Sequence, residues 1–474
     1  MPFDINKSVK NKEYKSAIEN LKRIAGKSLV QLKEENPNLL IFPEDLGALQ
    51  DGFNDKEKVI CSLFPPTTCQ FLETGNVMGW IGCGNTQLKI FSRFDSTIDK
   101  TKKEFKPKKD YFMYYILSRL GGFHITSLDY TKEKDEDSAL QNLLALMFPA
   151  FLRNAVTQGL YKEYRTFRRN DANVRGVINI NQHIRRNNPF VGKVAYSTRE
   201  FSFDNDITQL IRHTIEYIEG SYLGSIILGG DAETKQCVEV IRQATPTYNE
   251  KERGKIINNN LRPKMHPFYT DYISLQKLCM QILRDEGISY GVNSDDKVHG
   301  ILFDGAWLWE AYIFTLLENT GLGFIHPDNI AKTNALKLFK TRGETADQFI
   351  EDNRDAYPDF YNDKCVLDAK YKHLEKGVRR EDLYQVITYM HTMPRKIGGY
   401  IYPYQTGEND IIQTMKFELE GNGGLIFTIP FKIPNYTNDK NSDWNDFIKS
   451  MKNAEDSFIN DIKDRVNSIP EVSL

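Results

Sequence analysis

The chain has 474 residues and a formal net charge of −2, with 40% hydrophobic and 27% charged residues. This composition is ordinary for a folded protein and too apolar for an intrinsically disordered one. A prior of roughly 150 residues per domain predicts about three domains. Because the net charge is close to zero, the molecule as a whole does not attract phosphate as a small basic DNA-binding domain does.

The cysteines and the apolar stretches indicate the cellular compartment. Six cysteines are scattered along the chain without a CxxC pair, so neither a zinc site nor a disulfide framework is predicted. The first residues are charged where a signal peptide needs an apolar stretch, and the longest apolar stretch, residues 143–152, is far too short to span a bilayer. We therefore expect a soluble cytoplasmic protein with reduced thiols and no membrane partner.

The amino-terminal part is predicted to form a small, mostly β domain over residues 1–109. Residues 12–36 have the apolar spacing of an amphipathic helix, and prolines follow it. Residues 79–94 are typical of two strands joined by a Gly-Asn turn. The lysine-dense residues 99–110 favour an exposed connector over a DNA contact, and a domain boundary is predicted there.

Two further regions follow. Residues 110–260 are predicted to be a largely helical middle region with a strand-like insert at residues 173–180. Residues 261–474 are predicted to form a mixed α/β (α+β) domain. Its expected helices are residues 269–283, 307–317, 381–390 and 444–466, and its expected strands are residues 346–350, 357–361, 364–372, 398–404 and 424–430.

The most informative segment is YPDFYNDKCVLDAKYK, residues 357–372, a predicted hairpin that turns at Asn362 and Asp363. Alternation along its second strand places Asp368 and Lys370 on one face, while the other face packs. Two aspartates, Asp359 and Asp368, can hold a hard divalent cation such as Mg²⁺, with Mn²⁺ as an alternative, when substrate phosphate completes the ligand shell. A neighbouring lysine can then orient or stabilise the attacking hydroxide.

A D-x-K pattern alone also fits a surface ion pair, so three other residues matter. Glu310 lies in an otherwise apolar helix, where a carboxylate is costly without a partner such as a metal ion. Gln385 and Tyr389 stand four residues apart on the helix after the strand and therefore share a face.

Together these residues resemble the PD-(D/E)xK nuclease superfamily, in its QxxxY branch. The resemblance implies a restriction-endonuclease-like domain in which Asp359 and Asp368 are metal ligands and Lys370 is the catalytic lysine. It also implies that Glu310 is the helix acid that supports the metal. Gln385 and Tyr389 are then the helix pair at the active site.

Several stretches are similar to McrC, the nuclease partner of the GTP-hydrolysing AAA+ motor McrB, including its LlaJI-like relatives. They are residues 159–180 (GLYKEYRTFRRNDANVRGVINI), the following HIRRNN, FSFDNDITQLIRHTI at 201–215, and DAKYK with DLYQVITYM. The similarity implies a magnesium-dependent endodeoxyribonuclease of a type IV or McrBC-like restriction system that defends against phage. It also implies that the amino-terminal domain docks on, and stimulates, a hexameric McrB-like ring, which selects the double-stranded DNA target.

Other functions stay open at this point. The chain could act mainly as a non-catalytic docking subunit that activates a motor, or as a repair nuclease or resolvase that acts alone. Whether the target is methylated or unmodified is open as well. The basic doublets (Arg168 with Arg169, Arg185 with Arg186, Arg379 with Arg380) favour solvated charges when taken singly, and the eight histidines have no metal-binding spacing. The chain also lacks a GxxxxGK[ST] phosphate loop, so it is not expected to hydrolyse nucleotides itself.

Overall fold

The structure is a computed structural model that divides into two compact units. It describes residues 18–36, 39–43, 60–64, 71–83, 86–94, 110–120, 136–221, 224–284, 298–327, 333–338, 355–374, 377–405, 414–421, 423–434 and 444–467. Unit 1 comprises Met1–Ala139 and Ser294–Leu474, and unit 2 comprises Leu140–Asn293. This division differs from the three consecutive domains expected from the sequence, because unit 1 is built from both ends of the chain.

The first sheet of unit 1 combines strands from both ends of the chain in the order β1-β9-β4-β5. Its strands are β1 (Leu40–Phe42), β4 (Val77–Cys83), β5 (Thr86–Ile90) and β9 (Val298–Asp304). The antiparallel pairing of β4 with β5 confirms the predicted strand pair, although its turn at residues 84–85 lies outside the described residues. β9, which the sequence did not predict, pairs with β1 and β4 and thereby joins the later part of the chain to this amino-terminal sheet. A separate antiparallel pair joins β2 (Cys61–Phe64) to β3 (Phe71–Thr74).

The prediction of one helix over residues 12–36 was wrong within the described residues 18–36. A helical turn ends before Gly26, which has a φ of 76°, and α2 (Leu29–Glu35) begins only after it. Ser28 caps α2: its Oγ accepts from Gln31 N, and Gln31 Oε1 accepts from Ser28 N. Such a reciprocal capping box starts a new helix and interrupts the apolar period.

Gly300 in β9 lies so close to the backbone of β4 that a side chain at this position would clash with it. Its φ is 137°, and a Cβ there would lie 2.3 Å from Trp80 O in β4. We expect Gly300→Ala to lower the free energy of unfolding of unit 1 by about 2 kcal/mol or more. All four tryptophans lie in unit 1, so denaturation followed by tryptophan fluorescence measures it. Val30→Ala, at an exposed position of α2 in the same unit, is the control and should cause no loss. Equal unfolding of Gly300→Ala and wild type would contradict this expectation.

The second sheet of unit 1 has the order β12-β13-β14-β16-β15. Its strands are β12 (Phe360–Tyr361), β13 (Cys365–Ala369), β14 (Ile397–Tyr404), β15 (Lys416–Glu418) and β16 (Leu425–Lys432). β13, β14 and β16 run parallel, while β12 and β15 are antiparallel edges. The predicted strand at residues 346–350 lies outside the described residues, and the short pair β10 (Leu336–Lys337) and β11 (Asp355–Ala356) stands apart.

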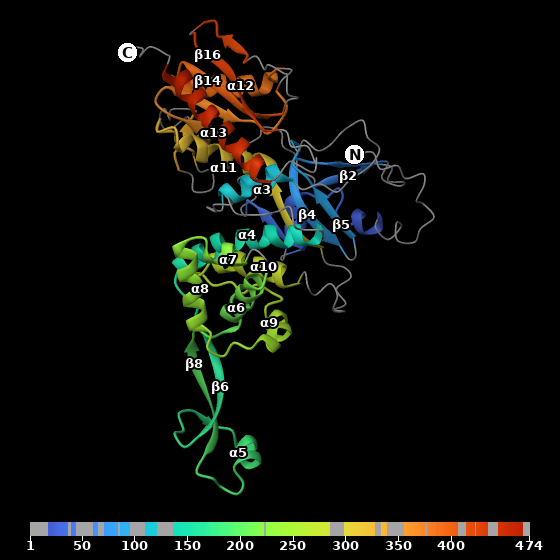
Figure 1. Ribbon diagram of the computed structural model, residues 1–474, viewed down its shortest axis with the longest axis vertical. Helices are drawn as coiled ribbons and strands as arrows, with labels where there is room; N and C mark the ends of the chain where they lie inside the picture. Colours follow the sequence, from blue (N-terminus) through green and yellow to red (C-terminus); the bar gives the residue numbers. More distant parts are fainter. Residues whose placement is uncertain are drawn as a thin grey trace, which may run out of the picture. The chain divides into compact units, whose positions relative to one another are not determined.

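Helices cover both faces of this second sheet. α12 (Arg380–Thr392) packs on the face that presents Tyr400 and Tyr402. On the other face, Phe431 contacts Trp309 of α11 (Gly305–Glu318) and Phe458 of α13 (Trp444–Asn467). Figure 1 shows α12 and α13 flanking the strands of this sheet. The mixed α/β class and these three predicted helices are confirmed.

A buried carboxylate joins three helices of unit 1. Glu455 of α13 accepts hydrogen bonds at Oε1 from Tyr115 at 2.9 Å and from Tyr312 at 2.8 Å, and Arg119 lies 3.1 Å from Oε2. Tyr115 and Arg119 belong to α3 (Tyr111–Leu120), and Tyr312 belongs to α11. A buried charge is tolerated when it is paired in this way, so Glu455 fixes α11 against its neighbours.

Unit 2 is a helical body built around one amphipathic helix, α6 (Asp206–Glu219), which packs against α7, α8, α9 and α10. The other helices are α4 (Glu136–Thr157), α7 (Gly224–Gly229), α8 (Ala232–Ala244), the 3₁₀ helix η4 (Glu250–Glu252), α9 (Arg253–Asn259) and α10 (Asp271–Arg284). Asn205 caps α6 through backbone amides of Ile207 and Thr208. α10 confirms the predicted helix at residues 269–283. No helix among the described residues is long and apolar enough to span a bilayer.

A long hairpin extends from this body, and we call β6, β7, β8 and α5 together the arm. Its elements are β6 (Glu163–Asp171), β7 (Val177–Ile178), α5 (Ile180–Arg186) and β8 (Val194–Ser202), with the strand order β6-β8-β7. Figure 1 shows β6 and β8 leaving the helices of unit 2, with α5 at the far end. The strand-like insert predicted at residues 173–180 contains β7, but the sequence did not predict β6 or β8; β6 has no buried face and therefore no apolar period.

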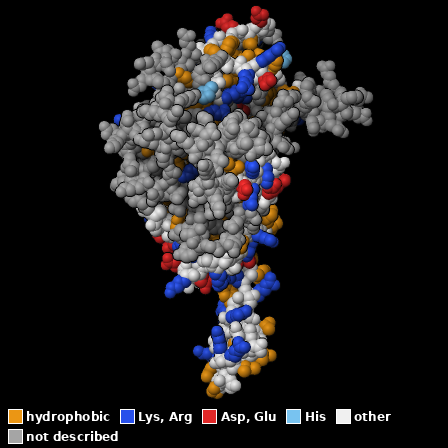
Figure 2. All heavy atoms as spheres, turned by 90° about the vertical axis from the view of Figure 1, so that its right-hand side faces the viewer, with side chains coloured by type: hydrophobic (Ala, Val, Ile, Leu, Met, Phe, Trp, Pro, Cys, Tyr) orange, Lys and Arg blue, Asp and Glu red, His pale blue; other side chains and the backbone are white. Residues whose placement is uncertain are grey.

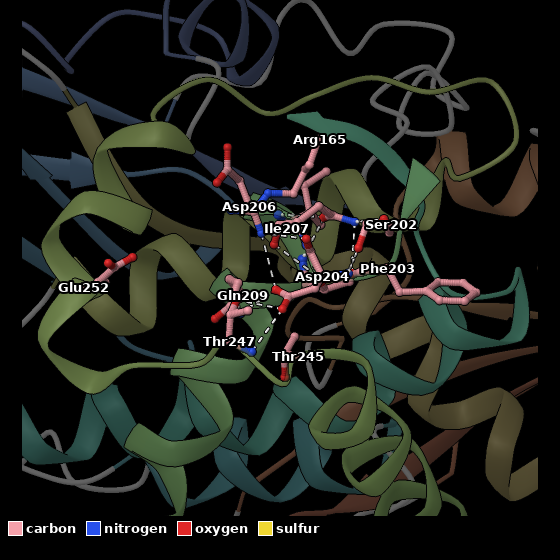
Figure 3. Close-up of polar contacts among 12 residues, drawn as sticks. Arg165, Ser202, Phe203, Asp204, Asp206, Ile207, Gln209, Thr245, Thr247 and Glu252 are labelled. Atoms are coloured by element: carbon pink, nitrogen blue, oxygen red, sulfur yellow. Dashed lines mark hydrogen bonds and ion pairs between the residues drawn. The ribbon is translucent and has the colours of Figure 1, made fainter. Parts of the chain in front are cut away.

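Asp204 anchors the base of the arm to the helical body (Figure 3). Its Oδ1 accepts from Gln209 Nε2 at 2.6 Å, and its Oδ2 accepts from Thr247 N at 3.0 Å and from Thr247 Oγ1 at 2.7 Å. Arg165 of β6 donates to the Asp204 carbonyl at 2.6 Å. Through its carboxylate and its backbone carbonyl, the buried Asp204 therefore ties β6, the start of α6 and the loop after α8 together.

His213 in α6 makes the stability of unit 2 depend on pH. It is fully buried against Tyr248, and burial, together with the positive charge of Arg253, lowers its pKa from 6.5 to about 4. Because the unfolded chain takes up the proton first, stability falls as the pH drops below about 6.5, and the loss levels off below about 4. We expect unit 2 to lose about 2 kcal/mol between pH 7.5 and pH 5. Hydrogen exchange of α6 measures this loss, and a His213→Gln variant that kept the same pH dependence would refute it.

Candidate active site

The hairpin of β12 and β13 brings the two predicted aspartates together. Phe360 pairs with Leu367, so Asp359 and Asp368 fall opposite each other in the next register position. Asp359 Oδ2 accepts a hydrogen bond from Ala369 N at 2.6 Å. The predicted turn is confirmed, since Asn362 Oδ1 accepts from the backbone amides at positions 364 and 365.

Asp368 lies at the centre of the group. Its side chain is fully buried, and Lys370 Nζ lies 2.8 Å from its Oδ2, whereas its Oδ1 has no hydrogen-bond partner within the described part of the chain. Every residue of β13 is buried, so the expectation that only one face of this strand packs was wrong. The reason is that helices cover both faces of the sheet.

The helix pair lies next to the lysine. Gln385 Oε1 accepts from Lys370 Nζ at 3.1 Å, and Gln385 Nε2 donates to Tyr389 OH at 3.1 Å. Both residues are on α12, one turn apart, as their spacing predicted. Asp368, Lys370, Gln385 and Tyr389 therefore form one chain of polar contacts.

Glu310 of α11 completes the predicted set from the other side. Burial raises the pKa of Asp359 well above its ordinary value, and the negative charges of Glu310 and Asp368 raise it further. The structure therefore brings all six predicted site residues into one neighbourhood. Burial alone would lower the pKa of Lys370, but Asp368 and Asp359 raise it above its ordinary value, so this lysine is a cation.

The structure adds three residues that the sequence analysis did not select. Asp382, at the start of α12, pairs with Lys372 at 2.6 Å and lies 3.9 Å from Lys370 Nζ. His326 donates from Nδ1 to the Asp359 carbonyl at 2.8 Å. The D-x-K-x-K spacing and the acid three residues before Gln385 were usable signals for Lys372 and Asp382, but no local pattern marks His326.

The donor set fits a divalent cation held by two carboxylates. Asp368 offers a buried oxygen without a hydrogen-bond partner, and Asp359 faces it with one oxygen already bound to a backbone amide. Among the described residues, no three Asp, Glu, His or Cys side chains stand together as a complete ligand cage. Mg²⁺ keeps several waters and binds through one or two carboxylates plus phosphate, so such a cage is not required.

The basic doublets lie at two different places. Arg379 and Arg380 are exposed where α12 begins, and Arg380 stacks on Tyr384 at 5.3 Å. The other doublets, Arg168 with Arg169 and Arg185 with Arg186, belong to β6 and α5 of the arm.

Comparison with known proteins identifies the family. The family model described as McrBC 5-methylcytosine restriction system component matches residues 72–403, well over half of the chain. This chain belongs to that McrBC family. The matched stretch contains the arm and all six predicted site residues, and the family resemblance found in the sequence is confirmed. No curated protein matches the chain.

Two solved structures are similar to this McrBC family chain. One is described as a refined half-complex from a tetradecameric assembly of Thermococcus gammatolerans McrB AAA+ hexamers with bound McrC. It has 15% identity and a TM-score of 0.44, covering 96% of this chain and 95% of that one. The other is the cryo-EM structure of the T. gammatolerans McrBC complex, with 13% identity and a TM-score of 0.28, covering 66% of this chain and 84% of that one.

Proposed function

We propose that this chain is the DNA endonuclease subunit of an McrBC-like restriction complex and hydrolyses phosphodiester bonds with a magnesium-dependent PD-(D/E)xK site. The observation that carries the proposal is the contact of Lys370 Nζ with both Asp368 and Gln385, at 2.8 Å and 3.1 Å. A surface ion pair would be exposed, whereas Asp368 is fully buried and Lys370 is mostly buried. The domain around the second sheet is then the nuclease domain.

Each residue has a distinct task in this proposal. Asp359 and Asp368 hold the cation, supported by Glu310. When bound, Mg²⁺ supplies charge neutralisation of the phosphate and lowers the pKa of a bound water. Lys370 stabilises the negative charge that develops during attack, and Gln385 keeps its ammonium in place through the 3.1 Å contact. Tyr389 in turn fixes the Gln385 amide.

We further propose that this chain docks on a McrB-like AAA+ GTPase and stimulates it. In this proposal the GTPase forms a hexameric ring and selects the DNA target. The arm is suited to the docking. Large apolar side chains are exposed on the arm, in its connecting loops and just after β8: Tyr164, Val174, Val177, Ile178, Ile180, Ile184, Phe190, Val191, Phe201 and Phe203. Figure 2 shows hydrophobic and basic side chains gathered on the arm at the bottom of the view. Exposed apolar patches of this kind mark protein interfaces. We therefore propose the arm as a docking element, in addition to the amino-terminal region expected from the sequence.

Reconstitution tests the proposed function. The purified chain, a McrB-like GTPase from the same source, GTP, Mg²⁺ and double-stranded DNA should together give cleavage that chelation of Mg²⁺ abolishes. Stimulated GTP hydrolysis without any cleavage would instead favour a non-catalytic activating subunit. Cleavage by the chain alone would favour a repair nuclease or resolvase. Among the described cysteines, Cys83, Cys237, Cys279 and Cys365 are free thiols, as suits the cytoplasm where we place the complex.

A further inference from the structure

His326 lies next to two acidic residues of the candidate site, Asp359 and Glu310. Its Nδ1 is 2.8 Å from the carbonyl oxygen of Asp359 and 3.6 Å from Glu310 Oε1. Its ring packs against two stacked rings, Phe314 of α11 at 5.0 Å between ring centroids and Phe360 of β12 at 5.5 Å. Glu310 lies on α11, and Asp359 directly precedes β12. Because the imidazole packs against both elements, its position is fixed with respect to both acidic residues.

The hydrogen bond to Asp359 also fixes the tautomer of the imidazole. A carbonyl oxygen only accepts hydrogen bonds, so Nδ1 must carry the proton. In the neutral ring Nε2 then keeps its lone pair. The same Nδ1 atom lies 3.6 Å from Glu310 Oε1, so one N–H group lies close both to the residue that precedes β12 and to the acid on α11.

We propose that His326 is a positioning residue that sets the distance between Asp359 and Glu310 and thereby tunes the affinity of the site for a divalent cation. This inference rests on the proposed function, because it needs Asp359 and Asp368 to be the ligands. Partners that orient metal ligands in this way change metal affinity about 10- to 100-fold when they are removed. His326 touches neither the DNA nor the cation in this role.

Titration of Mn²⁺ into the full-length chain without DNA, by calorimetry, tests the proposal without an activity readout. His326→Phe keeps a ring against Phe314 and Phe360 but removes both nitrogens, and its Kd for Mn²⁺ should rise about tenfold or more. His326→Asn retains an amide donor near the position of Nδ1 and should stay within about threefold of wild type. His326→Gln places its donor near Nε2 instead and should behave like His326→Phe.

The outcomes separate this inference from the proposed function. An Asp368→Asn variant is the control and should no longer bind Mn²⁺. If His326→Phe and His326→Gln bind as wild type does while Asp368→Asn does not, the role of His326 is refuted and the metal site stands. If His326→Asn weakens as much as His326→Phe, the Nδ1 donor is not what matters and the proposal is wrong. If Asp368→Asn binds like wild type, the proposed metal site itself fails, and the inference fails with it.

Discussion

A Lys370→Ala variant is expected to lose DNA cleavage by about 10²- to 10³-fold while its stimulation of the partner GTPase is unchanged. Lys370 Nζ lies 2.8 Å from Asp368 Oδ2, and despite its burial the two aspartates Asp368 and Asp359 raise its pKa above the ordinary value. Removing the ammonium leaves the developing negative charge without this partner. Single-turnover cleavage of DNA, measured beside GTP hydrolysis in the same reconstituted complex, provides both rates.

The control for this experiment is Lys416→Ala. Lys416 lies on β15 at the edge of the same sheet, its side chain is 60% exposed, and its pair with Glu418 is a surface contact of 3.5 Å. Surface pairs of this kind contribute little, so cleavage by this variant should equal that of wild type. Cleavage by Lys370→Ala at the wild-type rate would reject the assignment of the catalytic lysine. Loss of cleavage in both variants would point to general damage of the sheet.

The arm provides the second large effect. A double variant, Val177→Asp and Ile180→Asp, should weaken binding to the McrB-like GTPase on the order of a hundredfold. Val177 is 76% exposed and Ile180 is 67% exposed, so neither side chain contributes to the core of unit 2. Burying two new carboxylates against an apolar partner surface is costly, because they lose hydration without gaining partners. Calorimetry or light scattering of the complex measures the change in Kd.

A matched control lies in the same unit, outside the arm. Met265 and Phe268 are 83% and 81% exposed, and a double variant that replaces both with aspartate adds the same charge to the same unit. We expect it to bind the partner as wild type does and to unfold at the same temperature. If both double variants bind normally, the arm is not a docking element. This experiment measures partner binding and not DNA cleavage, so normal binding by both double variants would leave the assignment of the catalytic residues unchanged.

The parts of the fold that the sequence predicted are those with strong local patterns. α11, α12 and α13 have clear helical spacing, and the β12 and β13 hairpin is marked by its Asn362 turn. Most of the site residues could be predicted for a similar reason, because they lie close together in the sequence. Asp368 lies on β13, Asp359 directly precedes β12 and Lys370 directly follows β13, and Gln385 reaches Lys370 from the next helix.

The sequence could not predict features that depend on distant partners. β9 is a short apolar segment, and its place between β1 and β4 depends on strands more than 200 positions earlier in the chain. β6 has no buried residue, and β8 buries Ala195, Tyr196 and Thr198 without strict alternation, so no period of two marks either strand. His326 has no sequence signal because its role comes from a contact with a backbone carbonyl, which any residue type can offer.

The direct continuation of β9 into α11 has a mechanical consequence. Asp304 is the last residue of β9 and also caps α11, with its Oδ1 accepting from Ala306 N and Trp307 N. No flexible loop separates the first sheet from the helix that carries Glu310. A displacement of that sheet is therefore transmitted directly to α11, and the Glu310 carboxylate of the candidate site moves with it.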